Sequence, residues 1–273
     1  MLKYSDANTK ISKLYDVPEL AEWLDFGWFT AKIYSLDLLS GHSCPFAEKC
    51  HSKAVEFVNA KTNKVSRKVV DGEKTEHRCY SASQEAQYTN VYNRRKHNFD
   101  MLKECTTSAE MLNLFRDSMP RDAGIVRQHV GGDFFNSLYF RAWLDFAAEN
   151  PQTLFYAYTK SLNYWIDNIE LVNALPNVRL TASRGGRLDS MIEEHNLRES
   201  VVVLSEVEAH EMGLELDYDD SHAALEGGSF ALLIHGTQPA NSEAAKALVK
   251  IKLDKREGVK SWVIKSHGQP AAA

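Results

Sequence analysis

The sequence has no long apolar run. Hydrophobic residues make up 44% of its 273 residues, but no stretch approaches the roughly 18 consecutive apolar residues that a membrane-spanning helix needs. Residues 1–13 alternate polar and charged side chains and contain no apolar segment of the kind found in secretory signals. We therefore expect a protein with no membrane segment that works in the cytoplasm.

An excess of positive charge is also missing. The formal net charge is -5, whereas nucleic-acid-binding domains usually carry a basic patch or stripe. One short basic cluster exists, at residues 94–97, and it is best interpreted as the solvated face of a helix. Nucleic acid is thus an unlikely class of partner.

Cysteine is scarce, with four residues in the whole chain. Reducing compartments keep thiols free, so a chain without an export signal is not expected to carry a disulfide framework. An even number of cysteines in such a protein indicates either a metal site or thiols with no special role.

What the sequence does contain is a regular alternation of short apolar runs and amphipathic stretches. Six runs have the length and composition of strands, at residues 31–39, 125–130, 153–159, 178–182, 201–204 and 229–235. Helices are predicted at residues 16–29, 84–104, 107–120, 137–150, 161–173 and 241–252. A further edge strand is possible at residues 259–265. Thr107 with Glu110, and Ser205 with Glu208, have the capping-box spacing that starts a helix.

Strands separated by single helices predict a parallel sheet with right-handed crossovers. About six strands are too few for a full barrel, so we expect an α/β fold of one domain over residues 1–273, a partial or distorted βα (TIM-like) barrel. A doubly wound open sheet is the alternative. A polar, cysteine-bearing region, residues 40–107, follows the first strand, and residues 266–273 are predicted to form a flexible tail.

Polar residues follow several of the predicted strands. In parallel βα folds the loops after the strands gather at one side, where binding sites form. Lysine and arginine cannot accept the hydrogen bonds that helix caps require, so their presence at strand ends indicates a pocket. The candidate cofactor-binding residues are Gly131, Gly132, Asp133, Lys160, Arg184 and His235.

An acidic stretch at residues 215–222 suggests a different chemistry. Asp219, Asp220 and His222 are the side-chain types that bind a hard divalent cation and support metal-assisted hydrolysis. The simpler interpretation, which we favour, is an exposed strand edge followed by a turn.

The four cysteines are Cys44, Cys50, Cys79 and Cys105, and most of their neighbours in the sequence are polar. A buried structural cysteine usually occupies an apolar slot, so these surroundings favour metal ligation. Four thiolates can hold an iron–sulfur cluster or a tetrahedral zinc ion. The five residues between Cys44 and Cys50 are loose for a zinc ribbon, but cluster, zinc and free thiols all remain open from spacing alone.

Several segments of the chain resemble the bacteriophage gene-product-88 family. They lie at residues 36–45, 78–85, 96–100, 129–135, 156–161, 181–186 and 233–238. The resemblance implies a phage-encoded protein that acts inside the infected bacterium. Because the cysteine segments belong to these motifs, the resemblance strengthens the expectation of a [4Fe-4S] cluster held by all four cysteines, with a role in electron transfer to an unknown redox partner.

A weaker similarity concerns layout. Radical S-adenosylmethionine enzymes place cysteines after the first barrel strand and a Gly-Gly-acid turn after the second, where Gly131, Gly132 and Asp133 stand here. In those enzymes the turn holds the amino group of the cofactor. This chain lacks their tight three-cysteine motif, and four ligating cysteines would leave no iron open for the cofactor.

We therefore expect electron transfer, with a radical-type enzyme acting on a small molecule as the alternative. The remaining alternative is a zinc-binding hydrolase or nucleic-acid-processing protein that would use Asp133, Asp219, Asp220 and His222.

Overall fold

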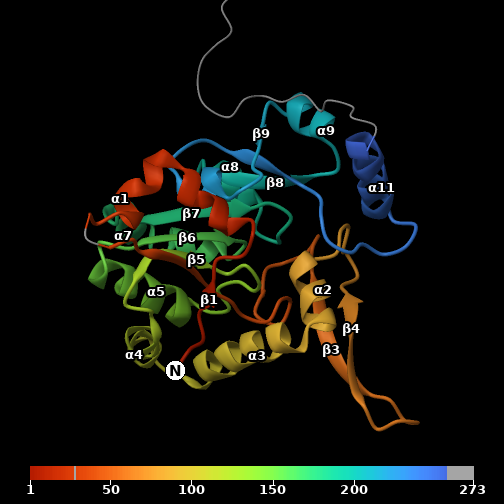
Figure 1. The fold of residues 1–273 in the computed structure, drawn as a ribbon, viewed down its shortest axis with the longest axis horizontal. Coiled ribbons are helices and arrows are strands. Elements are labelled where there is room, and N and C mark those ends of the chain that lie inside the picture. Colours follow the sequence, from red (N-terminus) through yellow and green to blue (C-terminus); the bar gives the residue numbers. More distant parts are fainter. Residues whose placement is uncertain (28, 257–273) are drawn as a thin grey trace, which may run out of the picture.

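The computed structural model describes residues 1–27 and 29–256 and is built on an eight-stranded sheet (Figure 1). Its strands are β1 (Ser5–Asp6), β2 (Lys32–Leu36), β5 (Ala123–Gln128), β6 (Leu154–Thr159), β7 (Val178–Ser183), β8 (Glu199–Val203), β9 (Glu215–Leu216) and β10 (Phe230–Leu233). Their order across the sheet is β1-β2-β5-β6-β7-β8-β10-β9. All neighbours are parallel except β1 and β2, which are antiparallel.

The predicted mixed α/β fold with a mostly parallel sheet is confirmed. The six predicted strands correspond to β2, β5, β6, β7, β8 and β10, which follow one another across the sheet in chain order. A doubly wound sheet would reverse its order at a switch point, and no reversal occurs before β9. The six-stranded TIM-like barrel is not confirmed, because the sheet stays open, with β1 at one edge and β9 at the other.

Helices from the crossovers cover one face of the sheet. They are α4 (Ser108–Ser118), α5 (Ser137–Glu149), α6 (Leu162–Ile166), α7 (Ile169–Ala174) and α8 (Ser190–Glu194). The N-terminal elements η1 (Ile11–Asp16), η2 (Pro18–Leu20) and α1 (Ala21–Leu24) and the short α10 (Ser221–Ala224) pack on the opposite face. Strand residues alternate between these layers, as their period of two requires: Phe155 packs with the crossover helices and Tyr156 with the N-terminal elements.

Three predicted helices are broken, one of them in the region at residues 40–107. The helix expected at residues 16–29 is reduced to η2 and α1, because Val17 is extended, as residues before proline prefer to be, and Asp25 is extended as well. The helix expected at 161–173 divides into α6 and α7 at Asn168. The side-chain amide of Asn168, in place of its backbone amide, donates to the Tyr164 carbonyl. The other predicted helices correspond to α5, α4 and α11 (Glu243–Arg256), and the Thr107 capping box is present at the start of α4.

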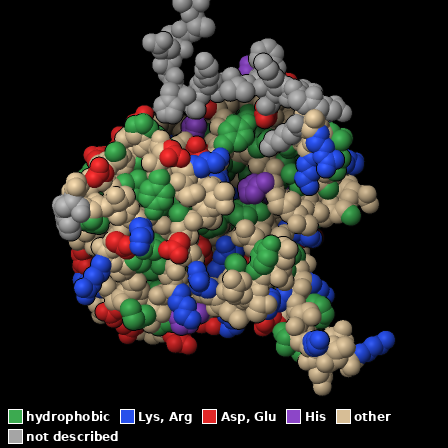
Figure 2. All heavy atoms as spheres, in the orientation of Figure 1, with side chains coloured by type: hydrophobic (Ala, Val, Ile, Leu, Met, Phe, Trp, Pro, Cys, Tyr) green, Lys and Arg blue, Asp and Glu red, His purple; other side chains and the backbone are tan. Residues whose placement is uncertain are grey.

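The region at residues 40–107 contains a projecting hairpin and two helices. The strands β3 (Ser52–Val58) and β4 (Val65–Asp71) form an antiparallel pair, followed by α2 (Tyr80–Gln87) and α3 (Thr89–Glu104). Figure 1 shows the hairpin standing away from the sheet, and Figure 2 shows basic side chains at its end. The sequence predicted one helix over 84–104, but extended backbone at Tyr88 separates α2 from α3.

The expected tail at residues 266–273 and the possible strand at 259–265 lie outside the described residues. Ser205 caps α9 (Glu206–Glu211) by accepting from the Glu208 amide, as predicted. Throughout residues 1–27 and 29–256, no helix has both the length and the apolar character needed to span a bilayer.

Candidate functional site at the ends of the parallel strands

A cavity of about 190 Å³ lies at the carboxyl ends of the central strands. Loops after β2, β5, β6 and β10 and the last residue of β7 contribute to its wall, because parallel strands bring these ends to one side of the sheet. Most residues singled out from the sequence line it. These are Cys44, Cys50, Cys79, Gly131, Gly132, Asp133, Lys160 and His235.

Three thiols share this cavity. Burial raises the pKa of the Cys44 thiol well above its usual value, and negative charge on Asp133, Cys79 and Cys50 raises it further. Burial together with Cys50 raises the pKa of Cys79 to about 11. These mutual effects place the three sulfurs within electrostatic reach of one another. Without a cation nearby, the buried pair stays protonated at neutral pH.

Backbone donors face two of these sulfurs. The Gly41 amide donates to Cys44 Sγ over 3.3 Å, and amides in the first turn of α2 lower the pKa of Cys79, which caps that helix. Such bonds favour the thiolate form, which is the form that ligates metals. The thiols of this site therefore resist ionisation by themselves. Beside a bound cation, the backbone donors would stabilise the thiolates.

Cys105 does not line the cavity, contrary to the expectation of four convergent cysteines. It caps the far end of α3, a 16-residue helix that is about 24 Å long. Its Sγ donates to the Met101 carbonyl, and the side chain packs against the main core. Burial and two acidic neighbours, Glu110 and Glu104, raise its pKa, and none of the other cysteines contributes. The helix length carries this cysteine away from the other three.

Arg184 is also placed elsewhere. Its guanidinium pairs with Glu199 and with Glu193 Oε1, the latter at 2.6 Å, and it is not among the cavity residues. Only its backbone carbonyl belongs near the site, where it accepts a hydrogen bond from Lys160. The sequence placed this residue correctly at a strand end, but acidic partners draw the side chain outward.

The Gly131–Gly132 turn is closely packed. Gly132 has φ +94°, in the left-handed region that favours glycine, and a Cβ there would lie 2.6 Å from Ser43 Oγ. A Cβ on Gly131 would lie 2.3 Å from Ser81 Oγ and 2.8 Å from Arg95 Cζ. Both positions therefore require glycine, because the loops after β2 and the helix α2 press directly on this turn.

Asp133 is buried beyond the turn and is hydrogen-bonded on both carboxylate oxygens. Oδ1 accepts from Thr159 Oγ1 at 2.7 Å and from the Phe134 amide, and Oδ2 accepts from the Lys160 amide at 2.9 Å. Burial raises its pKa to about 6, although these hydrogen bonds act in the opposite direction. A carboxylate has about four acceptor positions, so one remains for a ligand.

Lys160 and His235 close two sides of the cavity. The Lys160 ammonium donates to Ser183 O, Ser183 Oγ and Arg184 O, at 2.6 to 3.0 Å. The His235 ring lies against Tyr80, with ring centroids 4.5 Å apart, and burial lowers its pKa. Lys160 therefore fixes the end of β7, and a neutral His235 joins the β10 end to α2.

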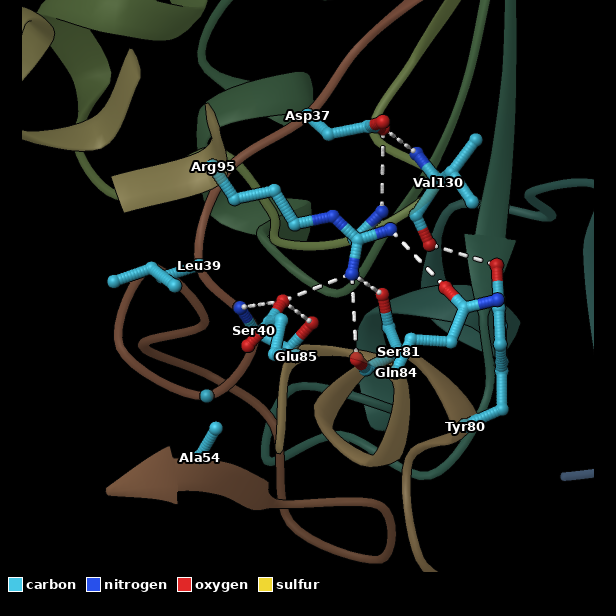
Figure 3. A network of polar contacts seen from close by, with 12 residues as sticks. Asp37, Leu39, Ser40, Ala54, Tyr80, Ser81, Gln84, Glu85, Arg95 and Val130 are labelled. Atoms are coloured by element: carbon cyan, nitrogen blue, oxygen red, sulfur yellow. Dashed lines mark hydrogen bonds and ion pairs between the residues drawn. The ribbon is translucent and has the colours of Figure 1, made fainter. Parts of the chain in front are cut away.

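A buried ion pair holds the cysteine loops in place (Figure 3). Arg95 of α3 donates to Glu85 Oε1 at 3.0 Å and to Ser81 Oγ at 2.6 Å, both on α2. Glu85 in turn accepts from the amide and hydroxyl of Ser40, in the loop that leads to Cys44. Asp37, which also raises the pKa of Arg95, accepts from the Val130 amide. The network joins both cysteine-bearing loops to the glycine turn.

This network corrects the interpretation of the basic cluster at residues 94–97. Arg94, Lys96 and His97 are indeed at the surface, but Arg95 is 4% exposed. Residue type alone does not indicate this difference, because which of four consecutive basic residues on a helix is buried depends on how the helix packs.

The acidic stretch is not a group of free carboxylates. Asp220 is fully buried and pairs with Arg127 of β5 and with Lys10 Nζ, the latter at 2.6 Å. Asp217 is also buried, and its Oδ1 accepts from the amides of Asp219 and Asp220. His222 pairs with Glu215 at 3.0 Å. The predicted strand edge is confirmed as β9, but the exposed turn is wrong for Asp217 and Asp220.

In the described part of the chain, no three histidine, cysteine or acidic side chains gather closely enough to hold a metal ion. The three cavity cysteines therefore share a space and influence one another without forming the compact group that a single ion needs.

These features define the class of protein: an open, mostly parallel α/β protein with a cysteine-lined cavity at the carboxyl ends of its strands. The chain belongs to the gene product 88 family, whose model matches residues 2–251. No curated protein and no solved structure is detectably similar to it.

Proposed function

We propose that this phage-encoded protein acts in the cytoplasm of the infected bacterium and holds a [4Fe-4S] cluster through Cys44, Cys50 and Cys79. The observation that carries the proposal is that these three thiols line one cavity while Cys105 lies at the far end of α3. Three protein ligands for four irons leave one iron without a cysteine. That iron would face the cavity and its polar residues.

The lack of a compact ligand group among the described residues favours a cluster over a single zinc ion. Zinc binds sulfur at about 2.3 Å, so the ligands of one ion must crowd within about 4 Å of each other. No such group exists in residues 1–27 and 29–256. Each cysteine of a four-iron cluster binds a different iron, so its sulfurs stand further apart around a larger core. The donors from Gly41 and the start of α2 support thiolates in either case.

The chain's own residues would then serve a small molecule at the open iron. With such an iron, a cluster of this type can bind S-adenosylmethionine and pass it an electron taken from an external reductant. Asp133 keeps one acceptor position for a ligand ammonium group, and Gly131 and Gly132 line the same cavity. We therefore favour the radical-type enzyme over simple electron transfer, reversing the preference drawn from the sequence.

The zinc-dependent hydrolase receives no support from the site. Of its four candidate residues only Asp133 has a free acceptor position at the cavity, whereas Asp219 accepts from a backbone amide, Asp220 pairs with Lys10 and Arg127, and His222 pairs with Glu215. Carboxylates neutralised by basic side chains are poor ligands for a hard cation.

The decisive experiment is anaerobic cluster reconstitution of the wild type and of four single cysteine-to-alanine variants. We expect about four irons per chain and broad absorbance at about 400 nm in the wild type and in Cys105→Ala. Cys44→Ala, Cys50→Ala and Cys79→Ala should each lose most of the iron. Cys105→Ala is the matched control, and equal loss in that variant, or a colourless iron-free wild type, would contradict the proposal.

A second measurement on the same samples separates an enzyme from an electron carrier. Calorimetric titration with S-adenosylmethionine should show binding to the reconstituted wild type and at least tenfold weaker binding to Asp133→Asn, which corresponds to about 1.4 kcal/mol or more. If the reconstituted wild type does not bind the compound, the electron-transfer role stands in its place.

A further inference from the structure

We propose that the part of the cavity formed by Lys10, Arg127 and Tyr158 binds an oxyanion, a phosphate or carboxylate group, of the substrate. The inference deepens the proposed function, because it assigns the charge of the molecule that the same cavity accepts. It stands on residues separate from the cysteines, and its test needs no cluster.

Two basic side chains share one carboxylate partner in this part of the site. Lys10 and Arg127 both pair with a single carboxylate, that of Asp220. Asp217 lies nearby, and its carboxylate oxygens already accept from the amides of Asp219 and Asp220 and from the Tyr158 hydroxyl. Other basic residues of the cavity wall are already occupied: Arg78 pairs with Asp71, and Lys160 donates to three oxygens. The basic side chains of the cavity wall that keep donors for a ligand are therefore Lys10 and Arg127.

Lys10 and Arg127 also have N–H donors that their contacts with Asp220 do not use. Arg127 has five N–H groups, and Nη1 donates to Asp220. Its Nε is buried and meets no partner among the described residues. The guanidinium carbon lies 5.1 Å from the centroid of the Tyr158 ring, which holds the plane of the fork in place. Lys10 Nζ makes one ion pair, and its side chain is 35% exposed.

An oxyanion is the ligand that these groups fit. Buried polar groups nearly always find a partner, and an unpartnered Nε beside a cavity marks a position that a ligand can complete. A planar arginine fork matches the two oxygens of a carboxylate or phosphate. The neighbouring wall is apolar, formed by Val202, Leu232 and Ile234. It suits the uncharged part of a small molecule that is held by its anionic end.

The placement also separates this group from the cysteines. Arg127 lies on β5 before the glycine turn, and Tyr158 lies on β6 before Lys160, so both project from the strands themselves. Lys10 reaches them from the N-terminal segment that covers this face of the sheet. The cysteines come from the region at residues 40–107, beyond the end of β2.

The test uses inorganic phosphate and acetate, added to cluster-free protein at constant ionic strength, with binding followed by calorimetry and thermal shift. We expect saturable binding of at least one of these anions. Tighter binding of phosphate would assign a phosphorylated substrate, and tighter binding of acetate a carboxylate. Lys10→Ala should weaken binding about tenfold, while Lys13→Ala, an exposed lysine on the same segment, should not change it.

Arg127→Lys is the second variant, chosen so that a loss of anion binding cannot be caused by misfolding. It keeps the positive charge opposite Asp220 and removes the planar guanidinium. It too should weaken binding severalfold. No anion binding beyond the ionic-strength effect, or equal binding by Lys10→Ala and Lys13→Ala, would overturn the inference. Competition between phosphate and S-adenosylmethionine on reconstituted protein would also overturn it, because the oxyanion would then belong to the cofactor. Because the anion titrations use cluster-free protein, failed reconstitution would leave their result standing.

Discussion

Individual side chains at the cavity have ionisation behaviour set by burial. His129 is the clearest case, since burial and the nearby Arg127 lower its pKa from 6.5 to about 3. Its Nε2 shares a hydrogen bond of 2.9 Å with the Tyr139 hydroxyl, and its Nδ1 has no partner in the described residues. The ring must stay neutral while the protein is folded.

This makes folding sensitive to acid. Between pH 6.5 and about 3 the unfolded chain protonates His129 and the folded chain does not, so the free energy of unfolding falls as pH falls. Between pH 7 and pH 5 the loss from this group is about 2 kcal/mol. His129→Asn should reduce that loss, and asparagine tolerates the φ of 70° at this position. Urea unfolding of both proteins at pH 7 and pH 5 measures this change in the free energy of unfolding.

His97→Asn is the matched control, because His97 is only partly buried and its ring meets the Met1 carbonyl near the chain's first residue. It should retain the full pH dependence of the wild type. An unchanged pH dependence in His129→Asn would show that the buried imidazole does not set the acid response.

At the scale of elements, a buried polar network joins α2 and α3 to each other and to the loops after β2 and β5. The ion pair between Arg95 and Glu85 lies almost out of solvent, with side chains 5% and 0% exposed. Burial raises the pKa of Glu85 even though Arg95 opposes the shift. Removing the arginine would leave an unpaired buried acid beside the loop to Cys44.

We expect Arg95→Met to lower the free energy of unfolding by about 3–5 kcal/mol, the usual cost of breaking a buried pair. Chemical denaturation gives the value. Arg94→Met, one residue away on the same helix and bonded only to exposed Ser5 Oγ in the described contacts, should change it by less than about 0.5 kcal/mol. Similar small effects in both variants would show that the network does not hold α2 and α3 in place.

At the scale of the whole molecule, the β3–β4 hairpin is packed at its base and exposed at its end. The base of the hairpin packs against α2, while Val58 and Val65 at its end are 62% and 58% exposed. Figure 1 shows the end of the hairpin clear of the other elements. The cysteines flank this hairpin in sequence, since Cys50 precedes β3 and Cys79 follows β4.

Replacing residues 58–65 by Asn-Gly would join Phe57 to Ser66, which already pair across the strands, through a two-residue turn. We expect a thermal midpoint within a few degrees of the wild type, because few buried groups are lost. Iron loading should be unchanged as well. A large drop in either the midpoint or the iron content would show that the hairpin end supports the cavity.

The sequence alone determined the alternation of strands and helices, the parallel sheet, the caps at Thr107 and Ser205, and most of the cavity residues. These follow from local rules: hydrophobic period, cap chemistry, and the fact that parallel strands end on one side. Glycines and polar residues directly after the strands could be assigned for that reason.

Only the tertiary structure decided which of these residues meet. The length of α3 takes Cys105 away from Cys44, Cys50 and Cys79, and acidic partners turn Arg184 outward. Packing buried Arg95 and joined Lys10, Arg127 and Asp220 from three distant parts of the chain. Such contacts depend on distances across the fold, which side-chain type and spacing along the chain do not encode.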